Sequence, residues 1–399
     1  MTAATRPVRV LVALHSFEPG GVERDILRFV PAWRAAGMDA RIALGRREGR
    51  LQEEAPDVPY FQMQTGGRST ANYETLWMIR KLPAVIREFE PDVLFLASNT
   101  LASVALGMRL KLGRKCPPIV FRVSNDLVRR DLSGIELRMH RLGLRIHANS
   151  HDVIVAMAPP VREEIVEQMR VDPAKVVVIN NASMTIADVN RFAAARDTAP
   201  RDHKGRHFLG VGRLAPQKNF ELMIEAFAKI ARPEDRLTIV GEGTRRASIT
   251  KRAQALGVAD RLHLPGHLIG PENWFAEADA FIMSSDFEGV PAVIVEALAA
   301  GMPIVATDCA TAIPSLIRGF GTLVPLGDAA ALAAAMDGIC NVKVDVPAMR
   351  ARASEFTTEA TTDTWGALFK RVAVEHAVDQ SGSAAIAPAM RPSRRIDLV

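Results

Sequence analysis

The stretch that decides the fold is Ser284–Thr307, which reads SSDFEGVPAVIVEALAAGMPIVAT. An apolar run before it predicts a buried strand, and a polar loop then leads to Pro291, where a helix is expected to begin. Gly301 marks the expected end of that helix, because glycine tolerates the left-handed cap. Residues 304–306 start another strand. This order predicts one unit of a parallel α/β sheet, in which ligands bind beyond the carboxyl ends of the strands.

The same alternation extends along the chain and predicts two domains. Six strands alternate with helices in the first half, and the pattern restarts after residues 193–207, which lack apolar periodicity. We therefore expect an N-terminal domain over 1–192, a linker over 193–207 and a C-terminal domain over 208–354, each a doubly wound parallel sheet. A last helix is expected within 355–377, and the small, mildly basic tail 378–399 is expected to be disordered.

Composition indicates a protein of a reducing compartment. The chain has 399 residues and is 48% hydrophobic, which suffices for two cores. Its three cysteines, Cys116, Cys309 and Cys340, are not closely spaced, so neither a disulfide framework nor a zinc site is expected. The apolar run Val8–Leu14 is too short for a membrane span and lacks the features of a signal peptide. We expect a cytoplasmic protein.

Basic residues are concentrated in one part of the N-terminal half. Residues 1–205 carry 30 Lys and Arg against 23 Asp and Glu, whereas residues 206–399 carry 20 against 22. Ten of the basic residues fall within 109–145. This is most often an ordinary solvated surface, but such density favours an anionic partner, and we expect peripheral contact with the inner face of the cytoplasmic membrane rather than nucleic acid.

The segment 132–146 predicts a basic amphipathic helix within this region. The apolar stripe consists of Leu132, Ile135, Met139, Leu142 and Ile146, and the basic cluster consists of Arg130, Arg138, Arg141 and Arg145. We expect the apolar stripe to pack on the N-terminal sheet. The leucines beside the arginines suggest contact with lipid or phosphate.

Two carboxylates give the opening stretch its candidate chemistry. Glu288 lies in the loop and Glu296 on the helix that follows, about 8 Å further on at 1.5 Å per residue. A carboxylate accepts hydrogen bonds from vicinal sugar hydroxyls, and the nearby helix N-terminus and Gly289 suit the approach of a phosphate. Alone, however, the pair is more often a loop charge and a helix-surface glutamate.

Two cations follow the first strand of the C-terminal domain. Arg213 and Lys218 flank a strand-to-helix loop in Gly210–Phe220 and could stabilise a diphosphate leaving group. Ordinary surface cations are the alternative. No two aspartates are separated by a single residue, so the chain has no DxD metal–nucleotide motif, and no metal or cofactor is expected.

Together these motifs resemble those of the retaining glycosyltransferases of family four, which have the GT-B architecture. GGVE, GRLxxQKN, GEG and EGVPxxxxEAxAxGxPxVAT follow one another in the family's order over roughly residues 8–340. The resemblance implies two Rossmann-like domains facing across a cleft, an acceptor in the N-terminal domain and a UDP- or GDP-sugar in the C-terminal domain. It also implies that the last helix crosses back to the N-terminal domain.

The resemblance also implies a role for each matching residue. Arg213 and Lys218 would hold the diphosphate, Glu288 would contact the donor sugar and Glu296 would contact the ribose. The implied donor-site backbone is that of Gly21, Gly212, Gly241, Gly289 and Val290. Transfer in this family retains the anomeric configuration without a metal.

The chain departs from the family at the sugar-recognising positions. Relatives often carry a histidine where this chain has Asn125 and Asp126, and a Gly-Pro-Glu where it has 312–315. Asn125, Asp126 and His15 are therefore the acceptor-side candidates, although a histidine at the place of His15 is more often a neutral one packed on the sheet. We expect transfer to a saccharide or lipid-linked acceptor in polysaccharide synthesis. The alternatives are a nucleotide-sugar 2-epimerase and a non-catalytic nucleotide-sugar-binding protein.

Overall fold

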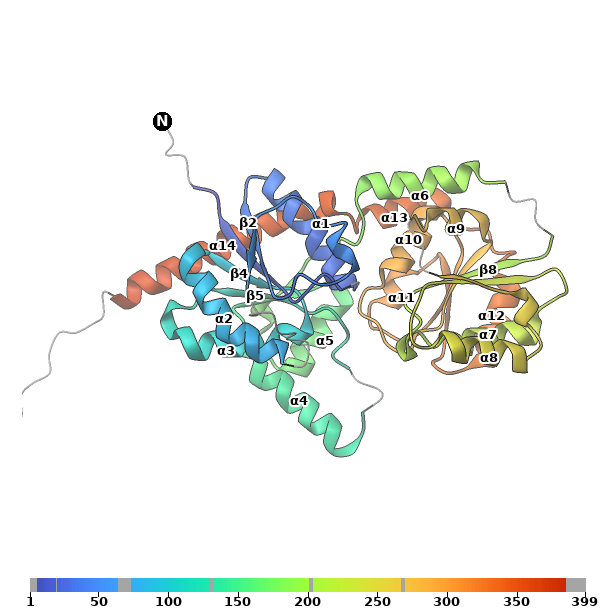
Figure 1. The fold of residues 1–399 in the computed structure, drawn as a ribbon, viewed down its shortest axis with the longest axis horizontal. Helices are drawn as coiled ribbons and strands as arrows, with labels where there is room; N and C mark the ends of the chain where they lie inside the picture. Colours follow the sequence, from blue (N-terminus) through green and yellow to red (C-terminus); the bar gives the residue numbers. More distant parts are fainter. Residues whose placement is uncertain are drawn as a thin grey trace, which may run out of the picture.

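The computed structural model of the protein describes residues 6–18, 20–63, 73–128, 132–200, 204–266 and 270–384. The chain forms two domains that lie side by side, each with a central sheet and helices on both faces (Figure 1). All strand pairs within both sheets are parallel, as the run of βα units predicts.

The N-terminal sheet has seven strands in the order β3-β2-β1-β4-β5-β6-β7. The strands are β1 (Arg9–Leu14), β2 (Asp39–Leu44), β3 (Tyr60–Gln62), β4 (Val93–Leu96), β5 (Ile119–Arg122), β6 (Val153–Ala156) and β7 (Val176–Val178). Six of them are predicted from the sequence. The edge strand β3 was missed because it is only three residues long and is not buried, so it lacks a continuous apolar run.

The C-terminal sheet has six strands in the order β10-β9-β8-β11-β12-β13. The strands are β8 (His207–Val211), β9 (Arg236–Val240), β10 (Leu262–Gly266), β11 (Ala280–Met283), β12 (Ile304–Thr307) and β13 (Gly321–Val324). The strand order reverses between β8 and β11. Such a reversal is the place where open α/β sheets leave a crevice for ligands.

Helices cover both sheets (Figure 1). Those of the N-terminal half are α1 (Gly21–Ala35), α2 (Glu74–Phe89), α3 (Ala102–Leu112), α4 (Gly134–Ala148) and α5 (Pro159–Met169). Those that follow are α6 (Ile186–Thr198), α7 (Phe220–Ile230), α8 (Arg246–Ala255), α9 (Glu272–Glu277), α10 (Ala292–Ala300), α11 (Ile313–Leu316), α12 (Ala329–Ile339), α13 (Val346–Ser354) and α14 (Thr358–Ala384).

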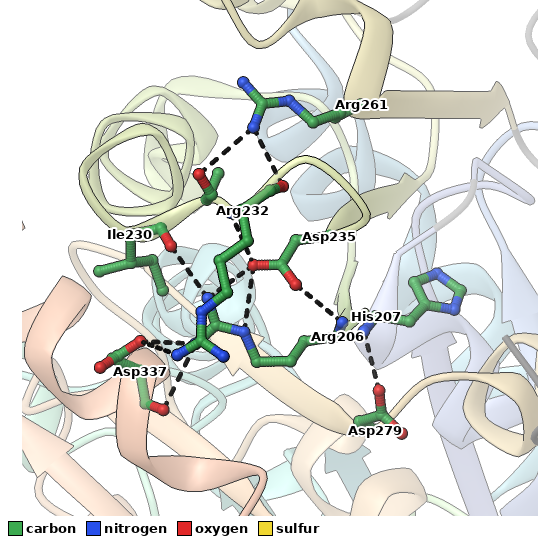
Figure 2. Close-up of polar contacts among 9 residues, drawn as sticks. Arg206, His207, Ile230, Arg232, Asp235, Arg261, Asp279 and Asp337 are labelled. Atoms are coloured by element: carbon green, nitrogen blue, oxygen red, sulfur yellow. Dashed lines mark hydrogen bonds and ion pairs between the residues drawn. The ribbon is translucent and has the colours of Figure 1, made fainter. Parts of the chain in front are cut away.

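A polar cluster around the buried Asp235 lies at the amino ends of β8, β9 and β11 in the C-terminal sheet (Figure 2). Arg206 donates to Asp235 at 2.6 Å and to Asp337 at 2.6 Å, and the backbone N–H of His207 donates to Asp279 at 2.8 Å. Although burial favours the neutral carboxyl, the hydrogen bonds from Arg206 and Arg232 lower the pKa of Asp235. The cluster holds the strands at the end away from their carboxyl ends, where the candidate site lies.

Helix α6 belongs to the C-terminal domain, so the domain boundary predicted at residue 192 is wrong. The predicted linker 193–207 is helical through Thr198 and its last residue already lies in β8. Phe192 packs on Phe275 at 5.3 Å, and the buried Arg196 donates to the backbone carbonyls of Phe275 and Ala276. Apolar periodicity did not predict the end of this helix, because Arg196 forms part of its buried face and donates hydrogen bonds to backbone carbonyls there.

The last helix, α14, packs on the N-terminal domain (Figure 1). Trp365 lies 5.5 Å from Trp33 of α1 and 5.1 Å from Phe95 of β4. Such aromatic pairs add to the free energy of burial and tie the end of the chain to its beginning. The helix continues through Ala384, so residues 378–384 of the predicted disordered tail are helical, and 385–399 lie outside the described residues.

Helix α4 turns the opposite face to solvent from the one predicted. The four apolar side chains Ile135, Met139, Leu142 and Ile146 are 76, 61, 48 and 51% exposed. The helix instead buries Ala148 and packs Leu144 against the main core. It carries two apolar stripes at helical spacing, and periodicity alone could not decide which of them faces the protein. Arg138 and Arg141 are exposed, Arg145 is half-buried, and Arg130 lies outside the described residues.

Candidate active site

The loop after β11 and the loop after β8 meet through an ion pair. Lys218 Nζ lies 2.5 Å from Glu288 Oε1, and only 7% of Glu288 is exposed. The sequence singles out these residues in two separate motifs, 70 positions apart, and the fold brings their charged atoms into contact. The strand order explains this, because β8 and β11 are adjacent and their carboxyl ends share one edge of the sheet.

Further hydrogen bonds lock the two loops together. Asn219 donates to Asp286 at 2.8 Å, Gln217 donates to the carbonyl of Phe287 at 2.8 Å, and the Ser284 hydroxyl donates to the carbonyl of Lys218 at 2.9 Å. Asn219 also caps α7 by accepting from the N–H of Leu222 at 3.3 Å. These bonds hold Lys218 and Glu288 in place before any ligand arrives, which is the preorganisation that stabilises developing charge.

Helix α10 follows the predicted start and stop signals. Gly301, at φ +67°, is its left-handed C-cap, which confirms the predicted end. The helix begins at Ala292, one residue after the predicted start, and Pro291 is its N-cap. The Val290 side chain is buried in the core, which leaves only its backbone for a ligand. The free N–H groups at the start of the helix lie directly after Glu288 and Gly289, where an anion binds favourably.

Glu296 projects from α10 toward α1 of the other domain. Burial raises the pKa of Glu296 to about 7, against the opposing effects of Arg28 and Arg24 on α1. The carboxyl is therefore near its midpoint at neutral pH. Hydroxyl groups of a ligand would bind the ionised carboxylate in preference to the neutral carboxyl, because both oxygens of the ionised form accept hydrogen bonds.

Arg213 is exposed in the loop after β8. Its charge acts on Glu23 of α1, the residue two positions after Gly21. Burial raises the pKa of Glu23, and Arg122 and Arg213 partly offset this effect. Glu23 belongs to the quoted GGVE motif. Sequence reasoning assigned it no role, because the cation that acts on it, Arg213, comes from the other domain.

Three glycines of the predicted donor site differ in their surroundings. A Cβ at Gly241 would lie 1.9 Å from the carbonyl oxygen of Gly212, so glycine is needed for the strand ends to meet. A Cβ at Gly289 would lie 2.4 Å from the carbonyl oxygen of Ser124 in the N-terminal domain. Gly21 has open space around it at the start of α1. Of these three glycines, Gly21 alone has no heavy atom within 4 Å of the place where a Cβ would lie.

The acceptor-side candidates lie in the N-terminal domain. His15 Nε2 lies 3.3 Å from Thr100 Oγ1, and His15 Nδ1 lies 3.5 Å from Glu74, so the ring sits in a polar cluster rather than against an apolar sheet. Burial lowers the pKa of His15, which Glu74 partly offsets, and this favours the neutral ring. Asn125 is exposed in the loop after β5.

Asp126 instead bridges the two domains. Its carboxylate accepts from the Thr311 N–H at 2.9 Å, and its own N–H donates to the Glu288 carbonyl at 3.1 Å. The Thr311 hydroxyl donates to Glu164 of α5 at 2.5 Å. Sequence reasoning missed Glu164 and Thr311, since neither belongs to a motif and they lie 147 positions apart.

Sequence comparison matches both halves of the chain to glycosyltransferase families. Residues 19–182 match the family "Glycosyltransferase Family 4", and residues 205–341 match "Glycosyl transferases group 1". A Campylobacter jejuni N-acetylgalactosaminyltransferase acting on a diphospho-undecaprenol-linked saccharide is 22% identical over 74% of this chain and 80% of that protein. The Rhizobium meliloti lipopolysaccharide core glycosyltransferase LpsE is 32% identical over 39% of this chain and 47% of that protein.

Solved structures show the same fold. The lipopolysaccharide outer-core galactosyltransferase WaaB aligns with a TM-score of 0.69 over 90% of this chain and 99% of that chain, at 17% identity. The Anabaena protein HepE, solved with UDP and glucose, aligns with a TM-score of 0.65 over 94% of this chain and 100% of that chain, at 18% identity.

This chain is a GT-B glycosyltransferase. The architecture and the enzyme class expected from the motifs are confirmed. Retention of configuration, independence of metal and the identity of the donor stay predictions. In the described part of the glycosyltransferase, no three His, Cys, Asp or Glu residues are grouped so as to hold a metal ion. No helix among its described residues is long and apolar enough to cross a bilayer.

Proposed function

We propose that the protein is a retaining, metal-independent glycosyltransferase that moves a sugar from a UDP- or GDP-sugar to a lipid-linked saccharide at the membrane surface. The observation that carries the proposal is the Lys218–Glu288 ion pair, which two hydrogen-bonded loops hold beside the N-termini of α7 and α10. Cation, carboxylate and free N–H groups together match a sugar diphosphate, which is anionic at one end and hydroxylated at the other.

Donor binding would exchange the partners of this ion pair. Lys218 can turn from Glu288 to the incoming diphosphate, and Glu288 can then accept from the sugar hydroxyls. Arg213 adds a second cation at the cleft edge. In the step that we propose, the bond from the anomeric carbon to the phosphate oxygen breaks as the acceptor oxygen bonds to the same face. The configuration is retained because the new bond forms on the face from which the phosphate departs, and the acceptor proton passes to that phosphate.

Fixed positive charge is the basis for proposing that no metal is required. Charge grows on the diphosphate as it leaves, and cations and helix N-termini held in position stabilise it. Lys218, Arg213 and the N-terminus of α10 lie beside the proposed diphosphate position. EDTA is expected to leave the transfer rate unchanged.

Two observations support a lipid-linked acceptor. The name of the Campylobacter jejuni relative describes a diphospho-undecaprenol-linked substrate. Helix α4 exposes four apolar side chains next to Arg138 and Arg141, which complements the apolar interior and anionic surface of a membrane. We propose that α4 places the acceptor domain on the inner face of the cytoplasmic membrane, where a lipid-linked saccharide is within reach.

A thermal-shift screen tests the donor assignment. A ligand that binds only the folded protein raises its melting temperature, so we expect one UDP- or GDP-sugar to raise Tm more than the others do. At about 100 times its Kd, that ligand should add about 3 kcal/mol to the free energy of unfolding. If no nucleotide sugar raises Tm, and none is consumed in the presence of membrane extract, the donor assignment is wrong.

Incubation without an acceptor separates the two alternatives. An epimerase would convert the nucleotide sugar into its epimer, and a binding protein would leave it intact even with an acceptor. The matching families and the relatives named above are described as glycosyltransferases, which argues against both. NMR of the product would also show whether the anomeric configuration is retained.

Donor affinity is expected to depend on pH through Glu296. The raised pKa of about 7 means that lowering the pH from 8 to 6 protonates most of the carboxyl. If the ribose hydroxyls donate to its ionised form, affinity for the preferred nucleotide sugar should fall about tenfold over this range. Its diphosphate diester does not titrate there. Isothermal titration calorimetry at both pH values measures the change.

Glu296→Gln serves as the control, because the amide keeps the shape and does not titrate. Its affinity should be weaker and independent of pH between 6 and 8. The stability of the ligand-free protein should change in the opposite direction. Because the pKa of Glu296 in the folded protein lies above its usual 4.5, its contribution to the free energy of unfolding falls as the pH rises toward 7. A wild-type affinity that is flat over this range would contradict ribose binding at Glu296.

A further inference from the structure

The two domains touch above the donor loops through a small set of hydrogen bonds. Asp126, in the loop after β5, accepts from the Thr311 N–H at 2.9 Å, and Glu164 on α5 accepts from the Thr311 hydroxyl at 2.5 Å. Thr311 lies in the C-terminal domain between β12 and α11. We call these three residues the closing contact.

Glu164 is built to hold this position. Only 6% of the residue is exposed, and its other carboxylate oxygen accepts from the backbone N–H groups of Leu127 and Val128, at 3.1 Å for Val128. These bonds fix both the carboxylate and the loop that carries Asp126. A buried carboxylate needs such donors, and one of its donors comes from the opposite domain.

The closing contact reaches the candidate catalytic loop directly. The Asp126 N–H donates to the Glu288 carbonyl at 3.1 Å, and the backbone at Ser124 approaches Gly289 too closely for any side chain there. The loop bearing Glu288 is therefore held from both sides, by Lys218 within its own domain and by the 124–126 loop of the N-terminal domain. If the domains separate, the second support is lost while the first remains.

We propose that Asp126, Glu164 and Thr311 are positioning residues that close the acceptor domain over the donor sugar and set the Glu288 loop for transfer. This inference rests on the proposed donor site. The contact consists of few polar bonds, which water can replace, so it can open for the donor to enter and close again once it is bound.

Thr311→Val tests the contact, because valine keeps the shape and the backbone N–H but removes the hydroxyl. We expect the transfer kcat to fall about 10- to 100-fold, the factor that corresponds to one hydrogen bond to a charged group. Affinity for the nucleotide sugar that gave the largest thermal shift should stay within twofold, because its proposed binding groups lie mostly in the C-terminal domain. Thr311→Ser should restore the rate, and Thr250→Val on α8 should have no effect.

Distances between spin labels give a readout that needs no substrate. Labels at Lys81→Cys on α2 and Lys251→Cys on α8, both exposed, in a Cys340→Ser background, report the separation of the domains. We expect a longer and broader distance distribution for Thr311→Val and Asp126→Ala than for the parent protein. An unchanged distribution together with an unchanged kcat would overturn the proposal.

The two proposals fail in different ways. If no nucleotide sugar binds the wild-type protein, the donor site is wrong, but the label distances still show whether the contact holds the domains together. If nucleotide sugar binds and Thr311→Val transfers at the wild-type rate, the donor site stands and the positioning role is wrong. Circular dichroism on each variant shows that a lost rate does not come from unfolding.

Discussion

Replacing Lys218 with methionine is expected to slow sugar transfer about 100- to 1,000-fold, the loss typical of removing one group that stabilises developing charge. Lys218 is the cation nearest to Glu288, at 2.5 Å, and it precedes the helix N-terminus of α7. Without it, the departing diphosphate would lose a fixed positive charge. Initial rates of transfer from the preferred nucleotide sugar, measured beside Lys229→Met on the far end of α7, give the ratio.

A second variant separates catalysis from folding. Lys218→Met alone leaves the buried Glu288 carboxylate without its cation, which costs about 3 kcal/mol of stability when a buried pair is broken. The double variant Lys218→Met/Glu288→Gln removes both charges, so we expect much of the stability to return while transfer stays slow. Chemical denaturation measures the stability. Full activity in the double variant would show that the ion pair is only structural.

Vesicle binding is expected to fall at least about 100-fold when the exposed apolar side chains of α4 are replaced with serine. The positions are Ile135, Met139, Leu142 and Ile146. Burying even part of each side chain in the membrane contributes on the order of 1 kcal/mol, and four such contributions exceed two factors of ten. Cosedimentation with vesicles of phosphatidylglycerol and phosphatidylcholine measures the binding.

Charge should contribute separately to the same binding. Exchanging Arg138, Arg141 and Arg145 for glutamine removes about 1 kcal/mol per residue near an anionic surface. This effect should disappear on pure phosphatidylcholine and at high salt. Val374 and Val378 of α14 are also exposed, so their serine variants are the matched apolar control. If the α4 variants bind vesicles as the wild type does, and the wild type sediments as a dimer that they disrupt, α4 binds a second copy instead.

Most of the candidate site could be placed from the sequence because its parts are local. Each of its two loops lies within a single strand–loop–helix unit, so the spacing of Gly212, Lys218, Glu288 and Pro291 fixes their place at a strand end and a helix start. The order of parallel strands then brings the two loops to one edge. Lys218 pairs with Glu288 because β8 and β11 are neighbouring strands, but no local sequence pattern predicts this pairing.

The face of a helix was less predictable than its position. The amphipathic segment predicts a helix close to Gly134–Ala148, but the stripe that was expected to be buried is exposed. A helix with two apolar stripes offers two packings of similar burial, and the neighbouring helices decide between them. The same limit hid α6, whose Arg196 reads as a polar linker residue until the carbonyls that it binds are known.

The sequence by itself determined the class of this protein: two parallel α/β domains, and a candidate site whose residues lie at fixed offsets from strand ends. Those offsets are set by backbone geometry within twenty residues or so. Tertiary structure alone decided which residues of one domain form hydrogen bonds with residues of the other. Thr311 and Asp126 are 185 positions apart, and their contact exists only because the two domains pack against each other. The closing contact depends on that packing, whereas the exposed face of α4 depends on its packing against α3 and α5, and no periodicity in the chain encodes either.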